Sequence, residues 1–165
     1  MWEFFIRAFN KVIYQPAMNS DRPAKILTTA NAFTKACEIL GYKYLHDRKT
    51  MPIVPMITNM AFACELYLKY LLERNNIEQP KGNDGHNFQI LISSLPEKLR
   101  QELINNISLA YNEINLANFD EKIEPIKKCF SNWRYIHEAT FEKDVDLELL
   151  VRLMLVLQNM CAKQK

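Results

Sequence analysis

The stretch IVPMITNMAFACELYLKYLL, residues 53–72, decides the fold because apolar side chains surround it on almost every side. Pro55 fits only near a helix start, because proline cannot donate a backbone hydrogen bond inside a helix. Asn59, Glu65 and Lys69 argue against a membrane span of this length, since two formal charges are costly in lipid. We therefore expect this segment to be a central helix that other helices surround.

Composition supports a helical protein of one domain. The chain has 165 residues, of which 48% are hydrophobic and 24% charged, enough for one globular domain with a core of its own. Only three glycines occur, and strand-like alternation of apolar and polar residues is missing. We expect residues 1–165 to form a single all-α domain, an up-and-down helical bundle of about five long helices and one short helix.

Apolar residues at spacings of three and four predict the other long helices. We expect them over residues 24–46, 99–114 and 119–138, and from an N-cap at Asp144 or Asp146 to about Met160. The third of these must bend or restart at Pro125. The polar stretch RNNIEQPKGNDG predicts a loop, and HNFQILISSLP after it predicts the short helix.

The first twenty residues carry aromatic and apolar side chains at helical spacing, and charges interrupt the apolar run that a signal peptide needs. We expect residues 1–20 to form a peripheral amphipathic helix that packs on the domain or on a second subunit. A membrane-surface role is the alternative. The apolar positions are Trp2, Phe5, Phe9 and Val12.

Cysteines and charge exclude several classes of protein. The four cysteines lie far apart, without CxxC spacing or histidine neighbours, so we expect apolar core residues of a reducing cytoplasm and neither metal nor cofactor. They are Cys37, Cys64, Cys129 and Cys161. The formal net charge of +2 permits RNA as a partner without requiring it. No Gly-rich phosphate loop and no DNA-reading motif is present.

The stretch CFSNWRYIHEATF places an Arg, a Tyr, a His and a Glu within five positions. On a continuous helix, His137 continues the apolar line of Phe130 and Trp133, while Arg134 and Glu138 share the adjoining strip. We expect these three polar residues to face protein or the edge of a cleft. The structural alternatives are a core histidine and an exposed Arg134–Glu138 pair.

Glu65 lies on a helix with little polar surface, and burying it without a partner would cost several kcal/mol. It should therefore contact a cation, and Lys69 and Arg134 are the candidates. Together with Glu138 these residues would form a charge-balanced network between two helices. Spacing does not decide whether such a network braces the fold or lines a site.

His86 follows a glycine in NDGHNF. It is either a capping or loop histidine, or Gly85 lets the backbone turn so that His86 points back toward the helix of Arg134. Both alternatives stay open from the sequence.

Three motifs, in this order, resemble a group of bacterial HEPN-domain proteins: AFACELYLKYLL (61–72), GHNFQILISSLP (85–96) and FSNWRYIHE (130–138). The resemblance implies an up-and-down helical bundle, commonly a homodimer, of toxin–antitoxin, anti-phage or RNA-processing systems. Many such proteins are metal-independent ribonucleases in which a His follows an Arg after four to six intervening residues. Here only two residues separate Arg134 from His137, and no later His exists.

Two hypotheses follow for a cytoplasmic bacterial protein of a defence or stress system. In the first, the protein is an RNA-directed enzyme. Arg134 holds a phosphate, and His137 or His86 is the general acid or base. Tyr135 and Glu138 then orient these groups.

In the second hypothesis the protein is a non-catalytic helical dimer that binds a nucleotide, RNA or a protein partner such as an antitoxin. It would also fit a companion subunit of a nucleotidyltransferase toxin. Glu65 and Lys69, which orient the site in the first hypothesis, then belong to a structural cluster. Neither hypothesis involves a membrane.

Overall fold

The computed structural model describes residues 22–46, 53–111, 113–138 and 145–164. Four longer helices dominate this part of the chain: α2 (Arg22–His46), α3 (Ile53–Arg74), α5 (Glu97–Ala110) and α8 (Leu147–Lys163). Three short helices complete it: α4 (Phe88–Ser93), α6 (Phe119–Ile123) and α7 (Cys129–Arg134). No strand occurs within the described ranges, so the all-α prediction is confirmed. The expected helix over residues 1–20 lies outside them.

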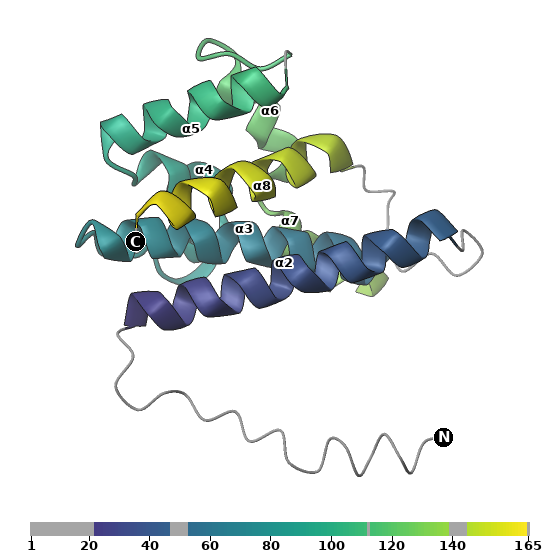
Figure 1. Cartoon of the computed structure of the whole chain (residues 1–165). Helices are drawn as coiled ribbons and strands as arrows, with labels where there is room; N and C mark the ends of the chain where they lie inside the picture. The colour runs from purple at the N-terminus through teal and green to yellow at the C-terminus, as the bar shows by residue number, and fades with distance from the viewer. Residues whose placement is uncertain (1–21, 47–52, 112, 139–144, 165) are drawn as a thin grey trace.

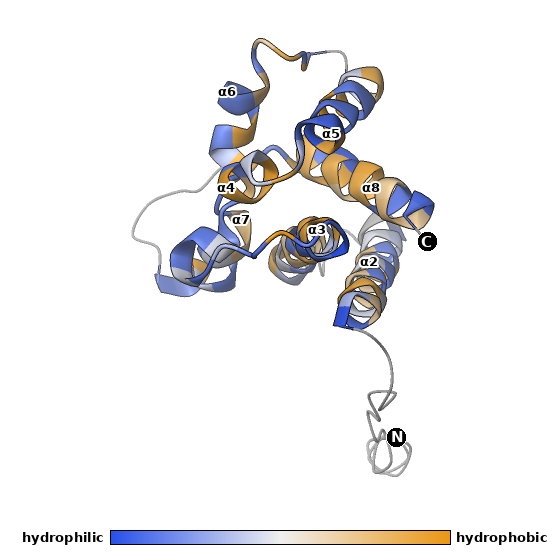
Figure 2. Cartoon of the chain, turned by 90° about the vertical axis from the view of Figure 1, so that its left-hand side faces the viewer, coloured by the Kyte–Doolittle hydropathy of each residue, from blue (hydrophilic) through white to orange (hydrophobic). Residues whose placement is uncertain are grey.

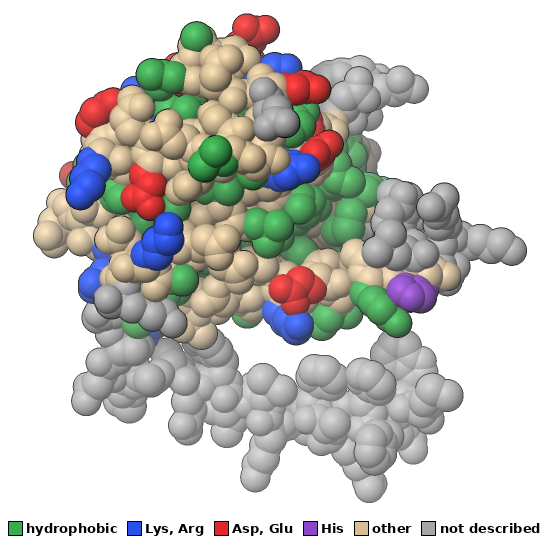
Figure 3. Space-filling view, turned by 45° about the horizontal axis from the view of Figure 1, so that its top comes forward, with side chains coloured by type: hydrophobic (Ala, Val, Ile, Leu, Met, Phe, Trp, Pro, Cys, Tyr) green, Lys and Arg blue, Asp and Glu red, His purple; other side chains and the backbone are tan. Residues whose placement is uncertain are grey.

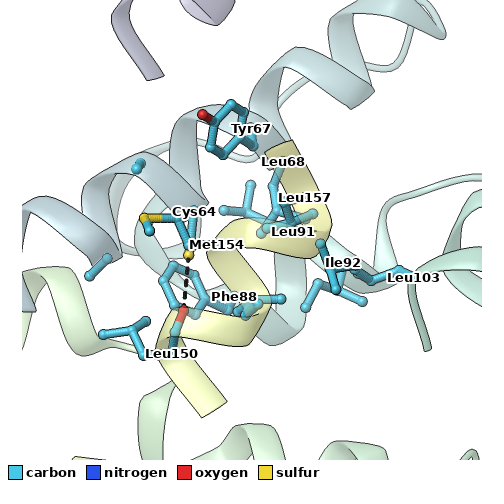
Figure 4. Close-up of a cluster of buried hydrophobic side chains, with 14 of the residues drawn as sticks. Cys64, Tyr67, Leu68, Phe88, Leu91, Ile92, Leu103, Leu150, Met154 and Leu157 are labelled. Atoms are coloured by element: carbon cyan, nitrogen blue, oxygen red, sulfur yellow. Dashed lines mark hydrogen bonds between the residues drawn. The ribbon is translucent and has the colours of Figure 1, made fainter. Parts of the chain in front are cut away.

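Helix α3 lies at the centre of the bundle. In the end-on view of Figure 2 it is surrounded by α2, α8, α4 and α7, and twelve of its residues are buried. Cys64 and Leu68 of α3 meet Phe88 and Leu91 of α4 and Met154 of α8 in the cluster of Figure 4. The prediction of a central helix is therefore confirmed. No described helix has the length and hydropathy that crossing a membrane requires.

Successive long helices run in alternating directions (Figure 1). Lys163 at the end of α8 approaches Glu102 in the first half of α5 at 3.8 Å. At the other end, the Tyr111 hydroxyl donates to Asp146 at 3.4 Å. The bundle therefore has the up-and-down arrangement that the sequence predicts.

Residues 119–138 do not form one helix. Pro125 lies in a 3-10 turn, η3 (Glu124–Ile126), as the predicted break requires. The chain then restarts as α7, which ends at Arg134, and a second 3-10 turn, η4 (Ile136–Glu138), follows. The prediction of a fifth long helix was wrong here. The helix predicted over residues 99–114 also ends earlier than expected, at Ala110.

Among the described residues, the side chains of Asp146 and Asn87 cap helices. Asp146, one of the two predicted caps of α8, accepts a hydrogen bond from the Leu149 amide at 2.9 Å. Asn87 caps α4 by accepting from the amides of Gln89 and Ile90. Asp144 lies outside the described residues.

All four cysteines are buried free thiols, in agreement with the prediction of apolar core residues. Burial raises the pKa of each thiol, to about 12 for Cys37 and Cys129 and further for Cys64 and Cys161. The thiolate form is therefore suppressed in the folded protein at neutral pH.

Candidate functional site

A buried carboxylate on the central helix is the nucleus of the candidate site. The Glu65 side chain is 1% exposed, and each of its oxygens has a partner. Lys69 Nζ, one turn further along α3, donates to Oε1 at 2.6 Å. His86 Nδ1 lies 2.8 Å from Oε2. Glu65 therefore has a charged partner on its own helix and a titratable partner from a distant loop.

The loop before α4 brings His86 to Glu65. His86 ends the 3-10 turn η2 (Gly82–His86), and its side chain is 38% exposed. Gly85 is buried, and a Cβ at this position would lie 2.7 Å from the Pro80 carbonyl oxygen. Only glycine fits so close to another stretch of backbone. His86 therefore lies in a loop turn, as the first sequence alternative has it, and its ring also faces α3 and the Phe130 ring of the helix that carries Arg134, as the second has it.

Helix α7 lines the other side of His86. The Phe130 ring centroid lies 5.6 Å from that of His86. The guanidinium of Arg134, one turn later, lies 5.5 Å from the same Phe130 ring and 4.6 Å from the ring of Tyr135. Arg134 Nη2 also donates a hydrogen bond to the Tyr135 hydroxyl. Arg134 and Tyr135 are exposed, so the cluster opens to solvent at this edge.

Two expectations for the region of α7 were wrong. His137 does not continue the apolar line, since its side chain is 72% exposed. Helix α7 ends at Arg134, and a 3-10 turn with about three residues per turn redirects the side chains that follow. For the same reason no Arg134–Glu138 pair forms among the described ion pairs. Glu138 instead contacts His137 at 3.5 Å.

The expected four-residue network is also different in the structure. Glu65 and Lys69 pair as predicted, but His86 takes the place that the sequence left to Arg134. Arg134 contacts aromatic rings instead of the carboxylate. The site thus contains one buried ion pair, one histidine at its border and one exposed guanidinium.

Sequence reasoning missed Phe62, which packs beneath the cluster. Its ring stacks on Phe130 with centroids 4.7 Å apart and planes 18° apart. Phe62 precedes Glu65 by three residues on α3, so the two side chains lie on neighbouring positions of one face. That spacing could have placed Phe62 beside Glu65 from the sequence. It could not show that the Phe130 ring would stack on Phe62.

The contact between Glu65 and His86 suits general acid–base chemistry. A carboxylate beside Nδ1 favours the tautomer with the proton on Nδ1, as assigned from the hydrogen-bond geometry. Nε2 then has a lone pair that can accept a proton. No group of three side chains suited to hold a metal ion occurs among the described residues.

The rest of the described surface offers no comparable cluster with histidine. Cavities of about 310 and 340 Å³ lie near the start of α2 and the end of α3. Neither is lined by Glu65, His86 or Arg134. On the face drawn in Figure 3, basic and acidic side chains are interspersed and form no basic stripe.

Comparisons of the chain with family models, curated proteins and solved structures find no match. The resemblance to a family therefore rests on the three sequence motifs alone, and a function must be argued from those motifs and the geometry of the site.

Proposed function

We propose that this chain is a HEPN-like protein of a bacterial defence or stress system that acts on RNA in the cytoplasm without a metal. One observation supports this most strongly. The three short motifs lie far apart in the sequence, yet one residue of each meets in the candidate site: Glu65 from the first, His86 from the second and Phe130 from the third. If the three motifs did not belong to one site, nothing would require these residues to lie together.

The geometry supports cleavage that uses the 2'-hydroxyl of the RNA itself. Nε2 of His86 takes the proton of the ribose 2'-hydroxyl, and the 2'-oxygen attacks the adjacent phosphorus. The bond from phosphorus to the 5'-oxygen breaks, this oxygen receives a proton from water, and the protonated His86 returns its proton to the solvent. The products are a 2',3'-cyclic phosphate and a 5'-hydroxyl. The exposed Arg134 binds the phosphate oxygens as negative charge develops on them.

The remaining candidates take supporting roles in this proposal. Lys69 compensates the charge of Glu65, so that the carboxylate can hold His86. Tyr135 orients Arg134 through the hydrogen bond and ring contact between them. His137 and Glu138 lie on the exposed turn beyond α7, where they would contact RNA that extends past the scissile bond. A homodimer would bring two such edges together.

The burial of Glu65 favours a second function. Both carboxylate oxygens are occupied inside the protein, an arrangement that also suits a purely structural brace. The chain would then be a non-catalytic helical dimer that binds a nucleotide or a protein partner such as an antitoxin. Sedimentation velocity of the full chain tests the dimer that both proposals include, and a monomer at micromolar concentration would contradict it.

The function is tested with transfer RNA and a single-stranded oligonucleotide in the presence of EDTA. We expect wild-type protein to release fragments with 2',3'-cyclic phosphate ends, and Arg134→Ala to lose at least about 100-fold in rate, as removal of a single charge-stabilising donor does. Arg152→Ala, an exposed arginine that also lies near a tyrosine ring, is the matched control. Absence of cleavage by a wild-type dimer would contradict the enzyme and favour the binding protein.

A further inference from the structure

Phe130 is the ring that the proposed base and the proposed phosphate-binding cation share. Its side chain is 8% exposed. The His86 ring lies 5.6 Å from its centroid, with the planes inclined by 38°, and the Arg134 guanidinium carbon lies 5.5 Å from it. No hydrogen bond or ion pair between His86 and Arg134 occurs in the described structure. Phe130 is therefore the side chain that His86 and Arg134 both contact.

The Phe130 ring is itself fixed against the helix that carries Glu65. It stacks on Phe62 of α3, and Phe62 meets Phe33 of α2 edge-on at 4.7 Å. Stacked and edge-on pairs are the arrangements that aromatic rings prefer. Phe130 is thus held in the same frame as the carboxylate that binds His86 Nδ1.

A backbone contact brings the two segments together without help from the ring. The amide of Phe88, two residues after His86, donates to the carbonyl of Lys127 just before α7 at 2.8 Å. Because this contact does not involve the Phe130 side chain, we expect the loop to stay near α7 when that side chain is replaced. The replacement would remove the flat face against which the imidazole and guanidinium rest, together with part of the packing of a buried side chain.

We propose that Phe130 is a positioning residue, which sets the ring plane of His86 and the guanidinium of Arg134 relative to each other. This inference rests on the proposed function. Phe130 contacts neither the scissile bond nor its phosphate. It acts by limiting rotation of the His86 ring about its contact with Glu65 and by keeping Arg134 on the same side of α7.

The test compares Phe130→Leu, which lacks the flat ring, with Phe130→Tyr, which keeps it. Phe119→Leu removes a ring from α6 that is buried still more deeply and is the control for lost packing. The first readout is the solvent-exchange rate of the His86 Nδ1 proton by NMR, which reports the contact with Glu65 without any substrate. The second is kcat and KM for RNA cleavage.

We expect Phe130→Leu to exchange this proton about tenfold faster and to lose about tenfold in kcat with little change in KM. Phe130→Tyr and Phe119→Leu should retain wild-type exchange and cleavage. Should Phe130→Leu fail to fold, Phe130→Met replaces it with the same expectation.

Equal proton exchange in Phe130→Leu and Phe119→Leu would overturn the positioning role. If the wild-type protein does not cleave RNA, the proposed function fails, and the exchange rates still decide whether Phe130 positions His86. The two failures are therefore distinguishable.

Discussion

At the scale of single residues, the buried carboxylate of Glu65 links the stability of the protein to its candidate chemistry. Lys69 neutralises its charge from the same helix, and His86 reaches it from a loop 21 positions further along the chain. An i,i+4 partner can be predicted from sequence, because helix geometry fixes it. The contact with His86 cannot be predicted from sequence in this way, because it depends on the close approach of Gly85 to Pro80.

Glu65→Ala should lower the free energy of unfolding by about 3 kcal/mol, because it leaves Lys69 without its partner in a largely buried position. Glu148→Ala is the matched control, since Glu148 pairs with Arg152 at the same i,i+4 spacing on an exposed surface. The free energy of unfolding of Glu148→Ala should decrease by no more than about 0.5 kcal/mol. Urea denaturation measures both, and equal losses would contradict a buried brace at Glu65.

Gly85→Ala should destabilise the protein by about 1–3 kcal/mol, because its methyl group would overlap the Pro80 carbonyl and displace the loop of His86. Gly41→Ala in α2 provides the opposite case. Nothing lies within 4 Å of a Cβ at that position, so helix propensity should stabilise the variant by about 0.5–1 kcal/mol. Thermal melting should show a lower melting temperature for Gly85→Ala and a higher one for Gly41→Ala. An unchanged melting temperature in Gly85→Ala would be inconsistent with this loop.

At the scale of helices, the length of the apolar pattern decided what could be predicted. The apolar patterns in α2, α3 and α8, periodic in α2 and α8 and nearly continuous in α3, extend over 17 or more residues, and the bounds of these helices agree closely with those expected. Between residues 119 and 138 the same spacings of three and four occur in two short helices and two 3-10 turns. Short segments give periodicity too few turns to distinguish 3.0 from 3.6 residues per turn. His137 was misplaced for this reason.

The N-cap of α8 gives a prediction at this scale. Asp146→Ala should cost about 1 kcal/mol, since the Leu149 amide loses its acceptor. Asp146→Asn should lose only a few tenths of a kcal/mol, because asparagine is an equally good N-cap. Chemical denaturation distinguishes the two, and an Asn variant as unstable as the Ala variant would show that the carboxylate acts through its charge instead.

At the scale of the whole molecule, the fold could be predicted from sequence and the candidate site only in part. The near-uniform apolar surface of α3 predicted a central helix, and the bundle around it follows from that single requirement. The site depends on which side of α3 the loop of His86 and helix α7 occupy. These are contacts between distant segments, and no local pattern encodes them.

The buried thiols predict a loss of stability in alkali. Burial raises the pKa of Cys129 from 9.0 to about 12, so the unfolded chain loses this proton at lower pH than the folded protein. The contribution of the Cys129 thiol to the free energy of unfolding is complete below pH 9. It decreases as pH rises toward 12, by at most about 1.4 kcal/mol per pH unit. The free energy of unfolding of Cys129→Ala should therefore fall less steeply above pH 9 than that of the wild type. Parallel curves would contradict this contribution.

In the proposed mechanism, His86, held by Glu65, performs the proton transfer, and His137 does not. The most direct measurement is the rate of metal-free RNA cleavage by His86→Gln and His137→Gln, with melting curves of both proteins. We predict that His86→Gln melts near the wild-type temperature, because glutamine can still donate to Glu65, and that it loses at least about 100-fold in rate. His137→Gln should retain most of the activity. Full activity in His86→Gln, or its loss only in His137→Gln, would contradict the account.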